Sequence, residues 1–573
     1  MNILNQSPRS RTEILLLVAF SGFLLFYGLG AFGLLGADEP RYAQVAREML
    51  DRHDWVTPTL NSRPWLEKPP LYYWQAMLSY RATRAFGSAN PVNEQTARFP
   101  GAFDAAIMIA AIYFYLRRSH PDRELDGALI TASCVGVIGF AHAASTDMPL
   151  TATFAISLLA WFAFYQERGL EKRRRLDLAI FYISLALGTL AKGPIAPALA
   201  AVVIILFVAV KRDWRTIPET LWLPGIFLFF AVSLPWYIAV QMRNPQFFRV
   251  FILEHNLARF SSNVYHHPQP FWFYLPVFLL ALMPWTIWLI AAIVERSRAI
   301  LSDPKEAFAS PDDSFALFLL IWMIVPVVFF SASQSKLPGY ILPAVPAAAL
   351  LVTEYLAGRR EQQIRIKWPL AAAHGILCGL LVFGALSAAA AIAGATPHHL
   401  SLSKASYASA AIATLFAISI AGTLLTRSGP RLVRSSTMIA VVVSVTVLIR
   451  LAAPVIDATQ SARLVAQSIQ SFSREPMPVA LYHVSRVQQY GLDFYLNRPT
   501  QSYQIDSVDR LVHGEVPGEV PGDAHPGVPG EAHLLVAASN TQPGFSTLLA
   551  GRRVSYLTSI PSQKLDLYWV GKE

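Results

Sequence analysis

Cysteine and charged residues are both scarce in this chain of 573 residues. The two cysteines, Cys134 and Cys378, each lie inside an apolar run, so neither suggests a disulfide framework or a cysteine-based zinc site. Only 15% of the residues are charged, whereas 54% are hydrophobic, and the apolar residues form runs near the length that spans a bilayer. The sequence therefore predicts a polytopic membrane protein.

Signs of nucleotide or nucleic acid binding are also missing. The sequence contains no D-x-D pair, and its match to G-x-G-x-x-G at residues 28–33 has no strand before it and no βα unit after it. We expect these small residues to lie inside a membrane span, where they allow close helix packing. The net charge of +10 comes from short basic clusters between apolar runs, which indicates membrane orientation and not a nucleic acid partner.

Hydropathy predicts about thirteen membrane spans, and the loops between them alternate in charge. The spans are expected near residues 12–33, 101–117, 125–142, 148–165, 177–191, 194–210, 221–240, 271–294, 314–331, 340–357, 368–395, 406–426 and 436–456. With a cytoplasmic N-terminus, every cytoplasmic loop is basic. The opposite side then receives two long interfacial loops, residues 34–100 and 241–270, and everything after about residue 457.

The composition changes in the last part of the chain. From Pro478 onward, segments such as "PVALYHV" alternate like strands. We therefore predict a membrane domain over residues 1–457 and a small soluble α/β domain over residues 458–573. Residues 514–533 form a Gly/Pro-rich repeat that can bury too little apolar surface to fold alone, so we expect a mobile loop there.

The first interfacial loop begins with two adjacent carboxylates, in "GADEPRYAQVAREML". Asp38 or Glu39 can cap a helix at this point, and Pro40 suits its first turn. Capping explains one carboxylate only, and the charge of Arg41 faces an unfavourable helix dipole at this end. We therefore favour a functional role for this motif, with capping as a side role.

The same loop contains "EKPPLYYW", in which charged residues precede aromatic ones. Tyr72 and its aromatic neighbours suit anchoring at the membrane interface. Anchoring does not explain Glu67 and Lys68, which two prolines hold on a stiff segment. A lysine fixed at the level of the headgroups suits a lipid phosphate.

Three shorter outward loops each carry a charged residue near glycine or proline. These are "STDMP" with Asp147, "AKGP" with Lys192, and "SKLPGY" with Lys336 and Tyr340. Taken singly, the lysines are explained as snorkelling anchors and the aspartate as part of a turn. Their recurrence on one face favours a joint function, because ionisable groups at membrane depth are costly to bury.

The second long loop contains "EHNLARF", which offers Glu254, His255 and Arg259 at helical spacing. The adjacent His266 and His267 are metal-ligand candidates together with Glu67. Tandem histidines are usually solvated, and no clear metal motif accompanies them. We therefore expect that no metal or other cofactor is required.

In order and spacing, these motifs resemble the aminoarabinose transferases of lipid A and the wider set of bacterial relatives of protein O-mannosyltransferases. The motifs that carry the resemblance are "ADEPRYAQVAREML", "EKPPLYYW", "AKGP", "EHNLARF" followed by "PFWFYLPV", and "SKLPGY". The resemblance covers roughly residues 12–360. It implies an all-α polytopic bundle of the C-type glycosyltransferase fold, an outward catalytic cavity, a small periplasmic C-terminal α/β domain, and a place in the bacterial inner membrane.

The resemblance also implies roles for individual residues. The catalytic carboxylate would be Asp38, with Glu39 supporting it and Asp147 shaping the sugar site. The residues that would hold the donor phosphate are Arg41, Lys68, Lys192, Arg259, Lys336 and Tyr340. The residues that would line the substrate cavity are Tyr42, Glu67, Tyr72, Glu254 and His255.

Proteins of this kind take a sugar from an undecaprenyl phosphate carrier. The resemblance therefore implies transfer of a sugar such as 4-amino-4-deoxy-L-arabinose to lipid A or another envelope acceptor, by a monomer. Two alternatives stay open: a protein O-glycosyltransferase of the same fold, and a transporter that binds lipid-linked sugars without chemistry. An inverted repeat of broken spans would favour the transporter, and the sequence shows none.

Overall fold

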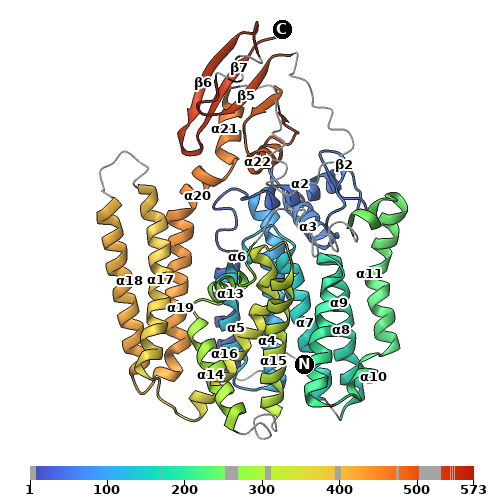
Figure 1. Ribbon diagram of the computed structural model, residues 1–573, viewed down its shortest axis with the longest axis vertical. Coiled ribbons are helices and arrows are strands. Elements are labelled where there is room, and N and C mark those ends of the chain that lie inside the picture. The colour runs from blue at the N-terminus through green and yellow to red at the C-terminus, as the bar shows by residue number, and fades with distance from the viewer. Residues whose placement is uncertain are drawn as a thin grey trace.

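The computed structural model describes residues 8–167, 169–251, 269–302, 311–393, 402–472, 477–502 and 531–572 except 543, 545, 547 and 548. It is a long helical bundle with a smaller mixed domain at one end (Figure 1). The bundle helices are α1 (Pro8–Phe26), α4 (Glu94–Ser119), α5 (Glu124–Ala132), α6 (Val135–Ala141), α7 (Asp147–Gln166), α8 (Glu171–Lys192), α9 (Ile195–Lys211), α10 (Thr216–Thr220), α11 (Leu223–Arg243), α13 (Tyr274–Ala281), α14 (Thr286–Ser302), α15 (Pro311–Ala332), η4 (Pro338–Ala344), α16 (Val345–Glu361), α17 (Trp368–Ala393), α18 (Leu402–Leu425) and α19 (Gly429–Val447).

The described helices make this a multi-pass membrane protein. Eight stretches are each long and apolar enough to cross a membrane, and the number rises to ten if two bent helix pairs each count as one span. The bent pairs are α5 with α6, at 63°, and α13 with α14, at 112°. Helices α1 and α8 are not among these stretches, and α9 has only 17 residues. The count of about thirteen spans therefore stays a prediction.

The glycine-rich segment at residues 28–33 differs from the expectation. It was expected inside a membrane span, but α1 ends at Phe26 and an irregular loop follows. Gly28 and Gly36 adopt positive φ angles of 82° and 64°, which glycine tolerates better than other residues. The carbonyl oxygens that a helix would have paired instead accept hydrogen bonds from Arg98, a side chain of α4. This loop leads directly into the acidic motif.

An interfacial layer separates the bundle from the C-terminal domain (Figure 1). It contains α2 (Asp38–Asp51), a short hairpin of β1 (Thr59–Leu60) and β2 (Arg63–Pro64), and α3 (Leu71–Ala85). Its core is built from Tyr42, Tyr72, Tyr73 and Met77, and Phe494 of the C-terminal domain packs into the same cluster. Phe494 thus attaches the C-terminal domain to the hydrophobic core of the interfacial layer, while the sheet has its own core clusters.

The C-terminal part of the chain contains the predicted small sheet with helices, and the domain boundary at residue 458 stays a prediction. Its elements are α20 (Ala453–Gln460), α21 (Arg463–Phe472), β3 (Val479–Tyr482), α22 (Arg486–Leu496), β4 (Gln501–Ser502), β5 (His533–Ala538), β6 (Val554–Ile560) and β7 (Leu565–Val570). The five strands have the order β4-β3-β5-β7-β6, and β3 pairs in parallel with both β4 and β5. Strand β7 pairs antiparallel with β5 and β6. Most of the predicted Gly/Pro-rich loop, residues 514–530, lies outside the described residues.

Candidate active site

The two adjacent carboxylates at the start of α2 have different partners. The Asp38 side chain is 50% exposed and forms an ion pair with Arg41, one helical turn later. Glu39 is buried and accepts hydrogen bonds from Arg98, at 3.1 Å from Nε and 2.8 Å from Nη2. The expected capping role was wrong, because the N-cap residue is Ala37 and no side chain caps the helix.

Glu39 joins three separate segments of the chain. Its Oε1 accepts a hydrogen bond from the amide of Ala144 at 2.8 Å, and its Oε2 accepts one from the amide of Leu35 at 2.7 Å. Ala144 lies in the turn that precedes Asp147, the first residue of α7. Because Asp38 is the immediate neighbour of Glu39, this buried carboxylate fixes the Asp38 segment against the Asp147 segment.

Arg41 already has partners within the protein. Its Nε donates to the carbonyl of Ala37 at 3.0 Å, and its guanidinium carbon lies 5.2 Å from the Trp65 ring centroid and 5.1 Å from that of Tyr490. Burial alone would lower the pKa of Arg41, but the negative charges of Asp38 and Glu67 outweigh it and raise the pKa above its usual value. Glu67 therefore lies close enough to Arg41 to influence its charge, and its role in the substrate cavity stays a prediction.

Buried tyrosines lie next to the charged side chains of Asp38, Arg41 and Glu67. The rings of Tyr42, Tyr72 and Tyr73 contact one another at centroid distances of 5.9 to 6.2 Å. The Tyr72 hydroxyl donates to the carbonyl of Ala97 at 2.8 Å, so it has a structural partner. Burial raises the pKa of Tyr42 and Tyr73 well above the usual tyrosine value. Both phenols therefore stay protonated beside the carboxylates.

A second cluster combines three of the short outward motifs. Asp147, at the start of α7, forms an ion pair with Lys192, the last residue of α8. The ammonium of Lys192 lies 4.4 Å from the ring centroid of Tyr340 in η4. At Gly339, a Cβ atom would lie only 2.7 Å from the carboxyl carbon of Asp147, so a larger residue would have to displace neighbouring atoms. Residues more than 190 positions apart thus meet at one point.

The remaining predicted site residues differ in burial, and several lie outside the described part of the chain. Lys336 is only 7% exposed, and its ammonium donates to the carbonyl of Ser333 at 2.6 Å. Lys68 is partly buried on the segment between β2 and α3. The predicted residues that lie outside the described residues are Glu254, His255, Arg259, His266 and His267. Within the described part of the chain, no group of three or more His, Cys, Asp and Glu side chains could hold a metal ion.

Sequence reasoning missed the buried arginine on which the first cluster depends. Arg98 is 0% exposed, and besides Glu39 it donates to the carbonyls of Leu29, Phe32 and Gly33 at 2.8 to 2.9 Å. A lone arginine at the beginning of an apolar run was the available signal, since such a residue is costly to bury without partners. Tyr490 gave no comparable signal, because its role depends on a contact between distant segments.

Comparison with known proteins shows the family to which this chain belongs. The model for dolichyl-phosphate-mannose-protein mannosyltransferases matches residues 12–251. An undecaprenyl phosphate-alpha-4-amino-4-deoxy-L-arabinose arabinosyl transferase of Aeromonas salmonicida is 31% identical over 386 residues, which are 66% of this chain and 67% of that protein. The chain belongs to this transferase family. A relative of the same name from Pseudomonas paraeruginosa is 32% identical over 359 residues, which are 62% of this chain.

The sequence matches cover only part of these relatives, whereas a solved structure of a similar protein aligns with nearly the whole chain. The chain spans 61% of the length of the Pseudomonas paraeruginosa relative. The crystal structure of ArnT from Cupriavidus metallidurans bound to undecaprenyl phosphate aligns with a TM-score of 0.73 over 98% of both chains, at 21% identity. The apo structure of the same protein aligns with a TM-score of 0.71. The predicted membrane glycosyltransferase fold is thereby confirmed.

Proposed function

We propose that this protein is a glycosyltransferase that moves 4-amino-4-deoxy-L-arabinose from undecaprenyl phosphate to lipid A or another envelope acceptor. The observation that carries the proposal is the site geometry in a member of this family: Glu39 links the segment of Asp38 to the segment of Asp147. This link supports a shared site for the half-exposed Asp38 carboxylate and for Lys192, which is ion-paired with Asp147 next to an aromatic ring. Carboxylates and cations at one interface suit a reaction that releases a lipid phosphate.

The chemistry requires one bond to form and one to break. An acceptor oxygen attacks the anomeric carbon of the sugar, and the bond from that carbon to the phosphate oxygen breaks. Undecaprenyl phosphate leaves with the electron pair of that bond, and the configuration at the anomeric carbon is inverted. A hydroxyl acceptor would give its proton to Asp38. A lipid A phosphate is already ionised, so Asp38 would instead orient groups or pair with the ammonium of the aminosugar. In both cases, nearby cations offset the charge that develops on the leaving phosphate.

The contacts support different roles for the predicted residues. Asp38 keeps half of its side chain exposed, so it is the carboxylate that a substrate can reach. Both oxygens of Glu39 are occupied, which favours positioning over chemistry. Lys192 and Tyr340 fit the donor phosphate, and Asp147 fits the adjacent sugar site. Roles for Lys68, Lys336 and Arg259 at the phosphate, and for Glu67, Glu254 and His255 in the cavity, remain part of the proposal.

The proposed cellular arrangement follows from the loop charges. We place the protein in the bacterial inner membrane as a monomer, with a cytoplasmic N-terminus and a periplasmic domain over residues 458–573, because the basic loops alternate with the motif-bearing ones. Accessibility tags at residues 172–175 and after Glu573 should therefore report opposite sides of the membrane. Two cytoplasmic tags would contradict the orientation.

Mass spectrometry tests the proposed reaction. Purified protein in detergent, supplied with the undecaprenyl phosphate-linked aminosugar and lipid A, is expected to produce lipid A with an added aminosugar. Deletion of the protein from its host should remove the same species from the cell envelope. Modified protein in place of modified lipid would favour the O-glycosyltransferase, and donor binding without any product would favour the transporter.

We expect Lys68 and Lys336 to share the donor phosphate. Lys336 is buried, with its ammonium on a backbone carbonyl, so it is not an anchor that reaches for the headgroups. Replacing either lysine with glutamine should weaken donor binding or slow transfer by about 10-fold, since each loses a charge-assisted contact. In the double variant, donor affinity or transfer rate should fall by less than the product of the two single fold-changes, because the two lysines share one ligand.

The measurement is donor affinity and turnover of each variant in detergent. Lys172→Gln is the control, because Lys172 is an exposed lysine in a basic cluster at the start of α8. Wild-type affinity and turnover in both single variants would remove Lys68 and Lys336 from the phosphate site.

A further inference from the structure

A helix of the C-terminal domain lies against the helix that begins with the acidic motif. In Figure 1, α22 lies next to α2. The Phe494 ring centroid is 4.3 Å from the guanidinium carbon of Arg47, whose Nη1 donates to the Phe494 carbonyl at 2.8 Å. Tyr490 is one helical turn before Phe494, so both rings project from the same face of α22. The Tyr490 ring contacts Arg41 in the same way, at 5.1 Å.

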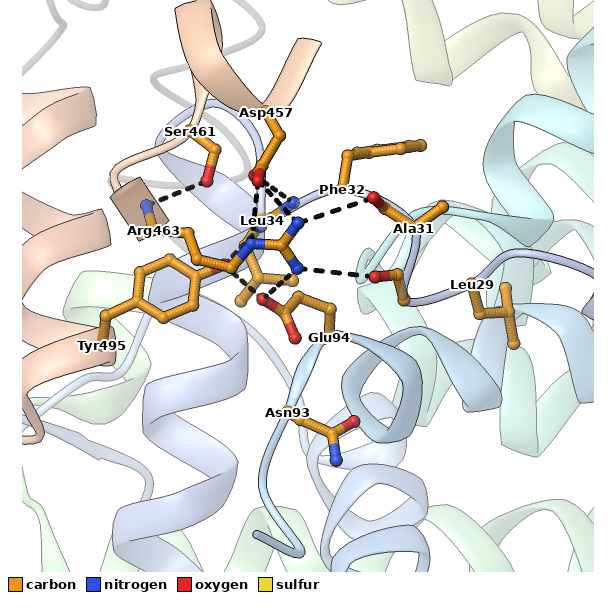
Figure 2. A network of polar contacts seen from close by, with 12 residues as sticks. Leu29, Ala31, Phe32, Leu34, Asn93, Glu94, Asp457, Ser461, Arg463 and Tyr495 are labelled. Atoms are coloured by element: carbon orange, nitrogen blue, oxygen red, sulfur yellow. Dashed lines mark hydrogen bonds and ion pairs between the residues drawn. The ribbon is translucent and has the colours of Figure 1, made fainter. Parts of the chain in front are cut away.

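The C-terminal domain also holds the loop that leads into α2 (Figure 2). The amide of Leu34 donates to the Tyr495 hydroxyl at 2.8 Å, and the amide of Gly33 donates to Asp457 Oδ1 at 2.8 Å. The Tyr495 hydroxyl in turn donates to Glu94 Oε1 at 2.9 Å. The backbone donors just before the acidic motif therefore have their partners about 420 to 460 positions later in the chain.

An arginine completes this attachment. Arg463 Nε donates to Asp457 Oδ2 at 3.0 Å, and its Nη1 donates to Glu94 Oε1 at 3.2 Å (Figure 2). At Gly33, a Cβ atom would lie 1.9 Å from the Ser461 hydroxyl oxygen. The loop and the C-terminal domain are thus in direct contact, with no space for an added side chain at Gly33.

We propose that the C-terminal domain contributes to the active site through Tyr490, which positions Arg41 and, through it, Asp38. Tyr490 holds the guanidinium of Arg41, which holds the carboxylate of Asp38. The inference rests on the proposed function, since it assigns Asp38 to the reaction. An aromatic ring beside a cation fixes its position without removing its charge, which leaves Arg41 able to orient the carboxylate.

The test compares two substitutions of Tyr490 in the full-length protein. Tyr490→Leu keeps an apolar side chain but removes the ring, and is expected to lower kcat by about 10- to 100-fold, because small displacements of reacting groups cost that much. The donor KM should change less than kcat, since Lys192 and Tyr340, which fit the donor phosphate in the proposed function, lie away from Tyr490 in the second cluster. Tyr490→Phe keeps the ring and should restore kcat. Tyr556→Ala, on β6 of the same domain and 59% exposed, is the matched control and should leave kcat unchanged.

A double variant with Arg41 tests whether Tyr490 acts on kcat by positioning Arg41 or by stabilising the fold in general. In an Arg41→Lys background, Tyr490→Leu should have little further effect on kcat, because the planar cation that it contacts is gone. Wild-type kcat in Tyr490→Leu would overturn the inference. Equal losses of kcat and melting temperature in Tyr490→Leu and Tyr490→Phe would overturn it as well, because they would indicate a structural role of the hydroxyl.

A measurement without substrate distinguishes this inference from the proposed function. Amide hydrogen exchange, followed by mass spectrometry, should become faster in residues 34–42 of Tyr490→Leu and stay at the wild-type rate in Tyr490→Phe. If the wild-type protein does not transfer the aminosugar, the proposed function fails, and exchange still decides whether Tyr490 holds the acidic motif. Unchanged exchange in Tyr490→Leu would refute the positioning role whatever the reaction is.

Discussion

Asp38→Asn is expected to abolish sugar transfer while the protein still folds and binds the lipid donor. Asparagine has the same shape as aspartate but carries no charge, so it can neither take a proton nor pair with a cation. Loss of a positioned carboxylate of this kind costs about 10²- to 10⁴-fold in rate. The fold should tolerate the change, because the Asp38 side chain is 50% exposed and its ion pair contributes little to stability.

The matched control for this experiment lies on the same helix. Asp51 is the last residue of α2 and its side chain is 52% exposed, close to the value for Asp38. Turnover of Asp51→Asn should equal that of the wild type, with donor affinity measured separately for each variant. Near-normal turnover in Asp38→Asn would remove Asp38 from the reaction.

Arg98→Ala is expected to destabilise the protein more than any other single change that we consider. All five guanidinium N–H groups of Arg98 donate hydrogen bonds, to Glu39 and to three carbonyls of the loop at residues 28–36. Its removal leaves the buried Glu39 carboxylate without its cation, and breaking a buried pair in this way costs about 3–5 kcal/mol. The acidic motif should lose its fixed position at the same time.

Thermal unfolding in detergent measures this effect. Arg84→Ala is the control, since Arg84 and Asp51 form an exposed ion pair at 3.6 Å that is worth at most about 1 kcal/mol. Replacing both buried partners, as in Glu39→Leu with Arg98→Met, should recover part of the lost stability because no unpaired charge remains. A melting temperature of Arg98→Ala equal to that of Arg84→Ala would contradict the structural role of this pair.

The two carboxylates of the acidic motif show where prediction from the sequence ends. The sequence indicated that the pair exceeds the needs of a helix cap, and the motif does lie at the start of an interfacial helix. Only the family resemblance assigned the catalytic role to Asp38 and a supporting role to Glu39, because the residue pattern alone does not show that the two carboxylates have different partners. Arg98 is 59 positions from Glu39, and only the folded chain brings the two together.

Local patterns alone determined the membrane class, the approximate helices and the existence of a small C-terminal α/β domain. These features depend on the length and period of apolar runs, which are properties of neighbouring residues. Tertiary structure alone decided that Glu39 is buried against Arg98, that Lys192 pairs with Asp147, and that Tyr490 contacts Arg41. Such pairings join segments that are distant in sequence, and charge or aromaticity at one position does not specify which distant partner it will meet in the folded chain.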